Sequence, residues 1–366
     1  MKKLFCVILL LPLFHVSCLA EGIGEETARI TGIYQVEEEL PEEERTVSGE
    51  LRLDGTYDTS GALSRLWDRF INACKKAIRG ELGFAVKLTL ISLLCLFSAV
   101  LCADKRVPQS MELAACLIGI LLLAGDMNSM IQEVNASLYR LSDYGKAAFP
   151  VFYSAVAASG AAVSASVKYA SVSFAATLYM ELAQGIVLPL IYAFLAFSVC
   201  SCVCENAILS ATCRFVKWCS VTSMTLLTAG FCTYIGLSGV ISGSADAAAV
   251  KAAKTVISTA LPVVGGILSD SASAILSAAG MIKNSAGVFC LIAICALCSG
   301  PFAILSVKML LLKAAAAVSA AACGGRYSRL LDSAGAAMAM LLGMVGSFGI
   351  VLFYSFMSGI RATVQG

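Results

Sequence analysis

The chain has 366 residues, of which 59% are hydrophobic and only 14% are charged. Soluble domains carry about 25% charged residues, so most of this chain has no polar face to present to water. Its single histidine, His15, lies in the N-terminal leader, which excludes Ser-His-Asp, Cys-His and histidine-ligated metal chemistry from the remainder. The net charge of +2 is too small to indicate a class of protein. The composition predicts an integral membrane protein, and we expect no cofactor and no nucleic-acid partner.

The N-terminus has the pattern of a secretory signal peptide over residues 1–20, with two lysines, an apolar run and small residues ending at Ala20. Whether it is cleaved or retained as an anchor, it places the following residues outside the cytoplasm. Residues 21–58 hold twelve of the 24 acidic residues of the chain and only three arginines. Such a segment buries too little apolar surface to fold alone. It is either disordered or a docking strip for a basic partner.

Residues 59–81 show helical periodicity with two different faces. Apolar residues recur every three or four positions from Leu63 to Ile78, and basic residues occupy the opposite side. This pattern is typical of an amphipathic helix that lies in the membrane interface.

Residues 82–366 are expected to form an all-α polytopic membrane bundle of about six to eight transmembrane helices, each needing about 20 apolar residues. The clear candidate spans are residues 82–103, 111–130, 148–167, 186–204, 219–242, 286–307 and 336–359. Residues 169–184 are either a short further span or half of a re-entrant pair. An even number of crossings returns the C-terminus to the outside. This arrangement places Lys308 on the cytoplasmic side and Lys283 in an external loop.

Ionisable residues within membrane spans are costly, which makes them functional candidates. Glu181 and Lys168, inside and just before the short span, are therefore candidate membrane-embedded polar residues. Glu181 either lines a polar pathway or lies near the membrane surface.

The 16 cysteines are scattered among apolar residues, where cysteine packs as a small hydrophobe. Cys295 and Cys298 form a CxxC pair, but no second pair accompanies it, so we expect no metal site. Gly343, Gly346 and Gly349 predict close helix packing, either within one bundle or against partner subunits.

Residues 244–284 are too amphipathic for an ordinary span. At their centre, Pro262 removes a backbone donor, and Gly265 and Gly266 permit unusual backbone angles. We expect a pair of amphipathic helices, broken between Pro262 and Gly266, near the external interface.

The run KAAKTVISTALPVVGGILSDSASAILSAAGMIKNSAG, from Lys251 to Gly287, is the most specific stretch of the chain. Together with the signal peptide, the acidic segment and the multi-span body, it resembles the stage III sporulation protein AE family of endospore-forming bacteria. Within its PVVGGILSD core, the structural motif consists of Pro262, Gly265, Gly266, Ser269 and Asp270.

The resemblance implies a membrane subunit, permease-like or scaffold, of a transenvelope channel between mother cell and forespore that sporulation requires after engulfment. It implies a location in the mother-cell membrane around the forespore. The implied partners are other membrane subunits, ring-forming subunits, a secretion-type ATPase and a forespore partner, and no catalytic residues carry over. Membrane lipids are expected as partners from the apolar composition itself. The alternative is an independent small-molecule transporter, although only one broken helix segment is evident where paired copies are expected. An intramembrane protease is disfavoured because the chain has no HExxH sequence and no paired membrane aspartates.

Overall fold

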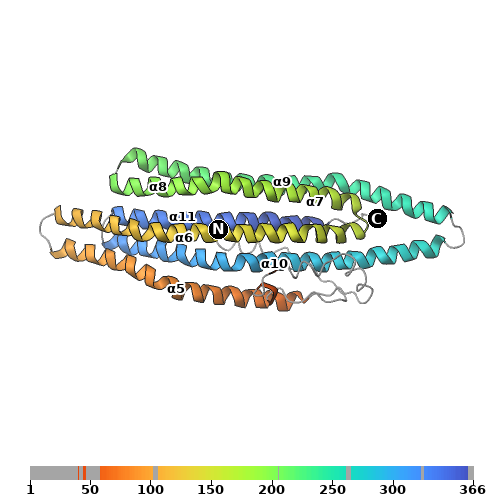
Figure 1. The fold of residues 1–366 in the computed structure, drawn as a ribbon, viewed down its shortest axis with the longest axis horizontal. Helices are drawn as coiled ribbons and strands as arrows, with labels where there is room; N and C mark the ends of the chain where they lie inside the picture. Colours follow the sequence, from red (N-terminus) through yellow and green to blue (C-terminus); the bar gives the residue numbers. More distant parts are fainter. Residues whose placement is uncertain are drawn as a thin grey trace.

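The computed structural model describes residues 40, 44–46, 58–101, 106–204, 206–260, 265–322 and 325–361. These residues form long helices and no strand. The helices are α5 (Thr59–Leu101), α6 (Arg106–Ala158), α7 (Ala162–Leu182), α8 (Leu188–Cys204), α9 (Ala207–Ala260), α10 (Gly265–Ala322) and α11 (Gly325–Ile360), and a π-helical segment, Ala183–Val187, joins α7 to α8. They lie side by side along one axis as an elongated antiparallel bundle (Figure 1).

Six stretches within the described residues are long and apolar enough to cross a membrane. They are Thr59–Ser98, Ser110–Ala158, Ala162–Cys204, Ala207–Ser238, Lys283–Ala322 and Gly325–Ile360. The predicted all-α polytopic bundle is confirmed, and six stretches fall within the predicted range of six to eight.

The predicted span 148–167 is wrong, because the chain reverses direction inside it. α6 ends at Ala158, and α7 begins at Ala162. Gly160, in the turn between them, has φ 93°, a left-handed conformation that a Cβ atom would disfavour. The apolar pattern continues through this turn, so hydropathy gave no sign of the reversal.

Residues 169–184 are not a separate span, because α7 continues into α8 through the π-helical segment. Pro189 lies two residues after this segment. Proline lacks the N–H that would bond to the carbonyl four residues earlier, and its ring crowds that carbonyl. A wider π-helical turn accommodates the ring without ending the helix.

The start of α5 is capped by the residue that precedes it. Asp58 Oδ1 accepts hydrogen bonds from the Gly61 backbone N–H and the Ser60 hydroxyl, each at 2.9 Å. Both bonds stabilise the ionised carboxylate and hold the pKa of Asp58 below its usual value, and the bond from Gly61 has the larger effect. α5 then runs unbroken to Leu101, so the predicted interfacial helix 59–81 and the first span form one rod.

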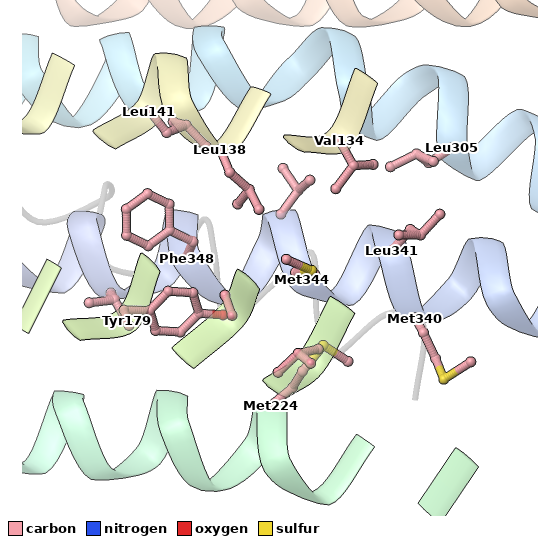
Figure 2. Packing of buried hydrophobic residues seen from close by; sticks show 14 of the residues in the cluster. Val134, Leu138, Leu141, Tyr179, Met224, Leu305, Met340, Leu341, Met344 and Phe348 are labelled. Carbon is pink, nitrogen blue, oxygen red and sulfur yellow. The ribbon is translucent and has the colours of Figure 1, made fainter. Parts of the chain in front are cut away.

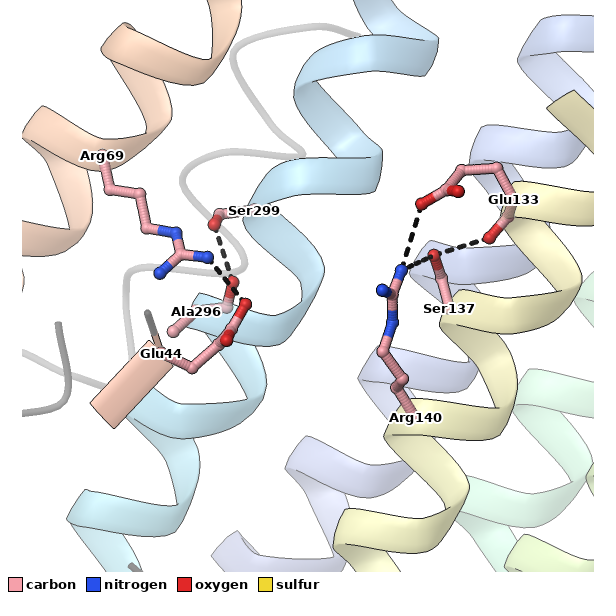
Figure 3. Close-up of polar contacts among 7 residues, drawn as sticks. All are labelled: Glu44, Arg69, Glu133, Ser137, Arg140, Ala296 and Ser299. Carbon is pink, nitrogen blue, oxygen red and sulfur yellow. Dashed lines mark hydrogen bonds and ion pairs between the residues drawn. The ribbon is translucent and has the colours of Figure 1, made fainter. Parts of the chain in front are cut away.

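A short turn of the acidic segment packs against α5. Glu44 Oε1 lies 2.6 Å from Arg69 Nη2 on the basic face of that helix (Figure 3). Leu40 is buried and belongs to the main hydrophobic core. This part of the acidic segment therefore has a basic partner within its own chain.

α11 occupies the interior of the bundle, together with much of α10. In the most apolar window of each of these two candidate spans, 67% of the residues are buried, against 17% to 33% in the other four. The close view in Figure 2 shows Met340, Leu341, Met344 and Phe348 of α11 surrounded by side chains from neighbouring helices. The rings of Phe348 and Tyr179 stack with their centroids 5.0 Å apart. α11 is thus the central helix against which the neighbouring helices pack.

Glycines let these helices approach closely. A Cβ atom added at Gly346 would lie 2.8 Å from the Phe302 ring, and one at Gly349 would lie 3.0 Å from Cys298 Sγ. These glycines of α11 thus pack against α10 within the chain, which is the first of the two predicted alternatives.

Gly119 provides a test of this packing. An added Cβ would lie 2.7 Å from the ring of Tyr327, which is fully buried and donates a hydrogen bond to the Leu88 carbonyl at 3.1 Å. Because Tyr327 is held in place, we expect Gly119→Ala to lower the free energy of unfolding by about 1 to 3 kcal/mol. The measurement is chemical unfolding of the purified protein in detergent.

The matched control lies on the same helix. Gly125 of α6 is exposed, and an added Cβ would meet no atom within 4 Å. Gly125→Ala is therefore expected to raise stability by about 1 kcal/mol through helix propensity. An equal effect of the two substitutions would contradict the packing argument.

Most large exposed apolar side chains lie toward the end of the bundle that contains the α5–α6, α8–α9 and α10–α11 connections (Figure 1). They belong to the following ranges: 82–101 of α5, 111–121 of α6, 186–203 of α7 to α8, 208–226 of α9 and 310–318 of α10. The opposite half of α6 is different, because Arg140 bonds to Glu133 at 3.1 Å and to Ser137 at 3.0 Å on an exposed face (Figure 3).

Candidate functional site

A buried ion cluster joins α5, α6 and α10. Lys308 of α10 is only 2% exposed, and its Nζ lies 2.5 Å from Asp126 Oδ1 and 3.1 Å from Glu81 Oε2. Its ammonium group also lies 5.6 Å from the centre of the Phe84 ring, on the same helix as Glu81. A lysine at this depth requires such partners, because an unpaired charge inside a protein is strongly disfavoured.

The cluster holds one more carboxylate than it holds cations. Asp126 Oδ2 is buried and has no hydrogen-bond partner among the described residues. The arrangement stabilises contact among three helices and leaves one carboxylate oxygen available to a proton or a polar ligand.

A second buried charged group lies toward the other end of the bundle. Asp246 of α9 accepts hydrogen bonds from the backbone N–H groups of Val163 and Ser164, each at 2.8 Å. Those N–H groups belong to the first turn of α7, which has no side-chain cap of its own. A carboxylate at a helix N-terminus is favoured by the unpaired N–H groups and by the helix dipole. Asp246 thus caps α7 from a different helix.

Lys168 belongs to the same group. It is buried, donates a hydrogen bond to the Ser358 carbonyl of α11, and lies close enough to Asp246 for attraction between their charges. Lys283 of α10 is also buried, and its charge repels that of Lys168. Four helices therefore contribute polar groups to this site.

The structure does not bring the two predicted polar residues together. Lys168 is buried near the start of α7, whereas Glu181 lies near the end of that helix with an exposed side chain. Near Glu181, the side-chain amide of Gln184 donates a hydrogen bond to Asn135 of α6 at 3.2 Å.

Of the predicted structural motif, Pro262 lies outside the described residues. α9 ends at Ala260 and α10 begins at Gly265, one helix end on each side of it. Gly265, Gly266, Ser269 and Asp270 belong to the first turns of α10, and their side chains lie outside the described part. The amphipathic pair predicted for residues 244–284 forms the ends of two long helices, α9 and α10, and not separate short ones.

The prediction from sequence put Lys308 and Lys283 in segments between spans, whereas both lie inside α10 and are buried. It also overlooked Asp126 and Asp246. A signal for Asp126 existed, since it is an ionisable residue within the predicted span 111–130. Nothing in one sequence pairs it with a lysine almost two hundred positions away.

The cysteines of the described part are free thiols, including Cys295 and Cys298 on α10. Cys298 Sγ packs close to Gly349 of α11. Its position is that of a small packing residue between two helices.

Comparison with known proteins identifies a family. The family described as stage III sporulation protein AE matches residues 54–362, a range that contains all of α5 to α11. The chain belongs to this family.

The stage III sporulation protein AE of Bacillus subtilis strain 168 is 22% identical over 272 residues, which cover 73% of this chain and 68% of that protein. No solved structure matches the chain. Membership of the stage III sporulation protein AE family, with six candidate spans, makes this a multi-pass membrane protein with a role connected to sporulation.

Proposed function

We propose that this chain is a non-enzymatic membrane subunit, scaffold or permease-like, of a transenvelope channel complex required for sporulation after engulfment. Its proposed location is the mother-cell membrane around the forespore. Family membership supports the connection to sporulation. The choice of an assembly role rests on the position of α11.

The axis of the bundle is where a solitary transporter would hold its substrate, near the middle of the membrane. In this protein, large side chains of α11 fill that axis, among them Met344 and Phe348, both fully buried. Two buried lysines are also engaged, Lys308 by carboxylates and Lys168 by a main-chain carbonyl. These features favour a packed scaffold whose passage, if it lines one, forms between subunits.

The exposed side chains support a particular orientation. The ranges rich in exposed apolar residues fit the lipid, while α6 alone, with 53 residues, is about 80 Å long against a hydrocarbon core of about 30 Å. The half of α6 with Arg140 and Glu133 then projects from the membrane. With an N-terminal segment outside the cytoplasm, this half faces the space between the two membranes.

This orientation divides the proposed partners between the two ends. Ring-forming subunits would contact the projecting half, near the α6–α7 turn and the Pro262 motif, which we propose as a structural element. The secretion-type ATPase would act at the end with the α8–α9 and α10–α11 connections. Other membrane subunits would contact the lipid-facing helices α5, α8 and α9.

The experiment is deletion of the gene in its own host, followed by induction of sporulation. We expect a block after engulfment, with few heat-resistant spores and weak late gene expression in the forespore, and rescue by the wild-type gene. Normal spore yield in the deletion strain would contradict the proposed role.

The alternative, an independent small-molecule transporter, requires a separate measurement. The purified protein alone, in sealed proteoliposomes, is expected to catalyse no uptake of labelled small metabolites, whereas affinity purification from sporulating cells is expected to recover other membrane subunits. Uptake by the purified protein without co-purifying subunits would favour the transporter.

A further inference from the structure

A cavity of about 220 Å³ lies among α8, α9 and α11, near the ends of these helices. Polar and charged side chains form much of its wall, including Ser198, Ser201, Ser210, Arg214, Lys217 and Arg329. Water occupies about 30 Å³ per molecule in the liquid, so the cavity has room for a small hydrated anion.

The charges around the cavity favour an anion. Arg214 and Lys217 of α9 and Arg329 of α11 contribute three positive charges, and Asp332 is the acidic lining residue. The carboxylate of Asp332 is already paired, because its Oδ1 lies 2.5 Å from Lys313 Nζ. The remaining charge is positive, and arginine is well suited to bind phosphate oxygens.

Ser198 provides independent evidence for a ligand. Its side chain is 3% exposed and lines the cavity, and its hydroxyl oxygen has no hydrogen-bond partner among the described residues. Other buried helix serines of this chain, such as Ser171 and Ser220, donate to a carbonyl four residues earlier. A buried hydroxyl without a partner is disfavoured, and an anion in the cavity would accept its proton.

The surroundings of the cavity indicate the source of that anion. Next to Arg214 and Lys217, α9 exposes Phe215 and Trp218, whose rings stack with centroids 6.1 Å apart. Tryptophan beside basic residues at one end of a membrane helix is typical of the level of lipid headgroups. Basic pockets between transmembrane helices bind phosphate-bearing headgroups of anionic lipids.

We propose that this cavity binds a phosphate group, supplied by the headgroup of an anionic phospholipid whose chains lie along α8 and α9. Arg214, Lys217 and Arg329 would neutralise the phosphate charge, and the Ser198 hydroxyl would donate a hydrogen bond to a phosphate oxygen. The proposal does not depend on the proposed channel role.

The test uses the full-length protein, purified in detergent and titrated separately with phosphatidylglycerol, phosphatidylcholine and inorganic phosphate. Bound molecules are counted by native mass spectrometry. We expect saturable phosphatidylglycerol binding that Arg214→Gln combined with Lys217→Gln weakens at least tenfold. Binding of inorganic phosphate alone, with the same loss in the variant, would retain the phosphate site and overturn its assignment to a lipid.

Two further variants separate this site from general charge and from misfolding. Lys75→Gln combined with Lys76→Gln removes the same number of exposed positive charges from α5 and is expected to leave the saturable binding unchanged. Ser198→Ala is expected to weaken binding severalfold without lowering the melting temperature of the lipid-free protein. Equal binding by wild type, Ser198→Ala and the Arg214–Lys217 variant, or an equal loss in the α5 variant, would overturn the proposal.

Discussion

Lys308→Met is expected to lower the free energy of unfolding by about 3 to 5 kcal/mol, the usual cost of removing one partner from a buried ion pair. The substitution keeps the length of the side chain but leaves Asp126 and Glu81 inside the bundle without their cation. The measurement is chemical and thermal unfolding of the purified protein in detergent.

The same helix offers the control for this prediction. Lys313 pairs with Asp332 at 2.5 Å, but the two side chains are 40% and 57% exposed. Lys313→Met is therefore expected to change stability by no more than about 1 kcal/mol. Adding Asp126→Asn and Glu81→Gln to Lys308→Met is expected to recover much of the loss, because no uncompensated charge then remains. Equal losses for the two lysines would show that burial of Lys308 contributes nothing.

Asp246→Ala is expected to have the second largest effect, a loss of about 3 kcal/mol, because two backbone donors of α7 lose a charged acceptor. The substitution also removes the negative charge that attracts buried Lys168. Unfolding in detergent measures the loss. Hydrogen exchange at Val163 and Ser164 locates it, since both amides are expected to exchange faster.

Two variants control for this effect. Asp246→Asn keeps one acceptor oxygen and is expected to lose less stability than Asp246→Ala. Asp143→Ala removes an exposed aspartate of α6, 3.5 Å from Lys146, and is expected to stay within about 0.5 kcal/mol of wild type. Protection of the two α7 amides in Asp246→Ala at the wild-type level would rule out the capping role.

The two buried charged sites join different groups of helices, with α10 contributing a lysine to each. The Lys308 site connects α5, α6 and α10, and the contacts of Asp246 and Lys168 connect α7, α9 and α11. At the Lys308 site, between lipid-surrounded helices, there is little hydrophobic driving force, so packing and polar contacts provide specificity. This division gives a physical reason for charges inside a bundle that is otherwise apolar.

The amino-acid sequence by itself determined the class of the protein. A chain with 59% hydrophobic residues in long runs satisfies its backbone groups inside lipid only as helices, so the all-α bundle followed from composition and periodicity. The run around Pro262 and the order of the spans were sufficient to indicate the family, which the match over residues 54–362 confirms.

Helix boundaries within the most apolar part depended on the tertiary structure. The reversal at Gly160 and the continuation through Ala183–Val187 both lie in sequence of nearly uniform hydropathy. There a turn or a wide helical segment is selected by contacts with neighbouring helices.

The tertiary structure alone also decided which charges meet. Lys308 follows a predicted span, and Asp126 lies within another, yet folding brings them to 2.5 Å inside the bundle. The unpartnered Ser198 hydroxyl and the three cations around its cavity are likewise spread over α8, α9 and α11. Hydropathy reports how one segment partitions between water and lipid, whereas the burial of a charge depends on the residues that other segments place beside it.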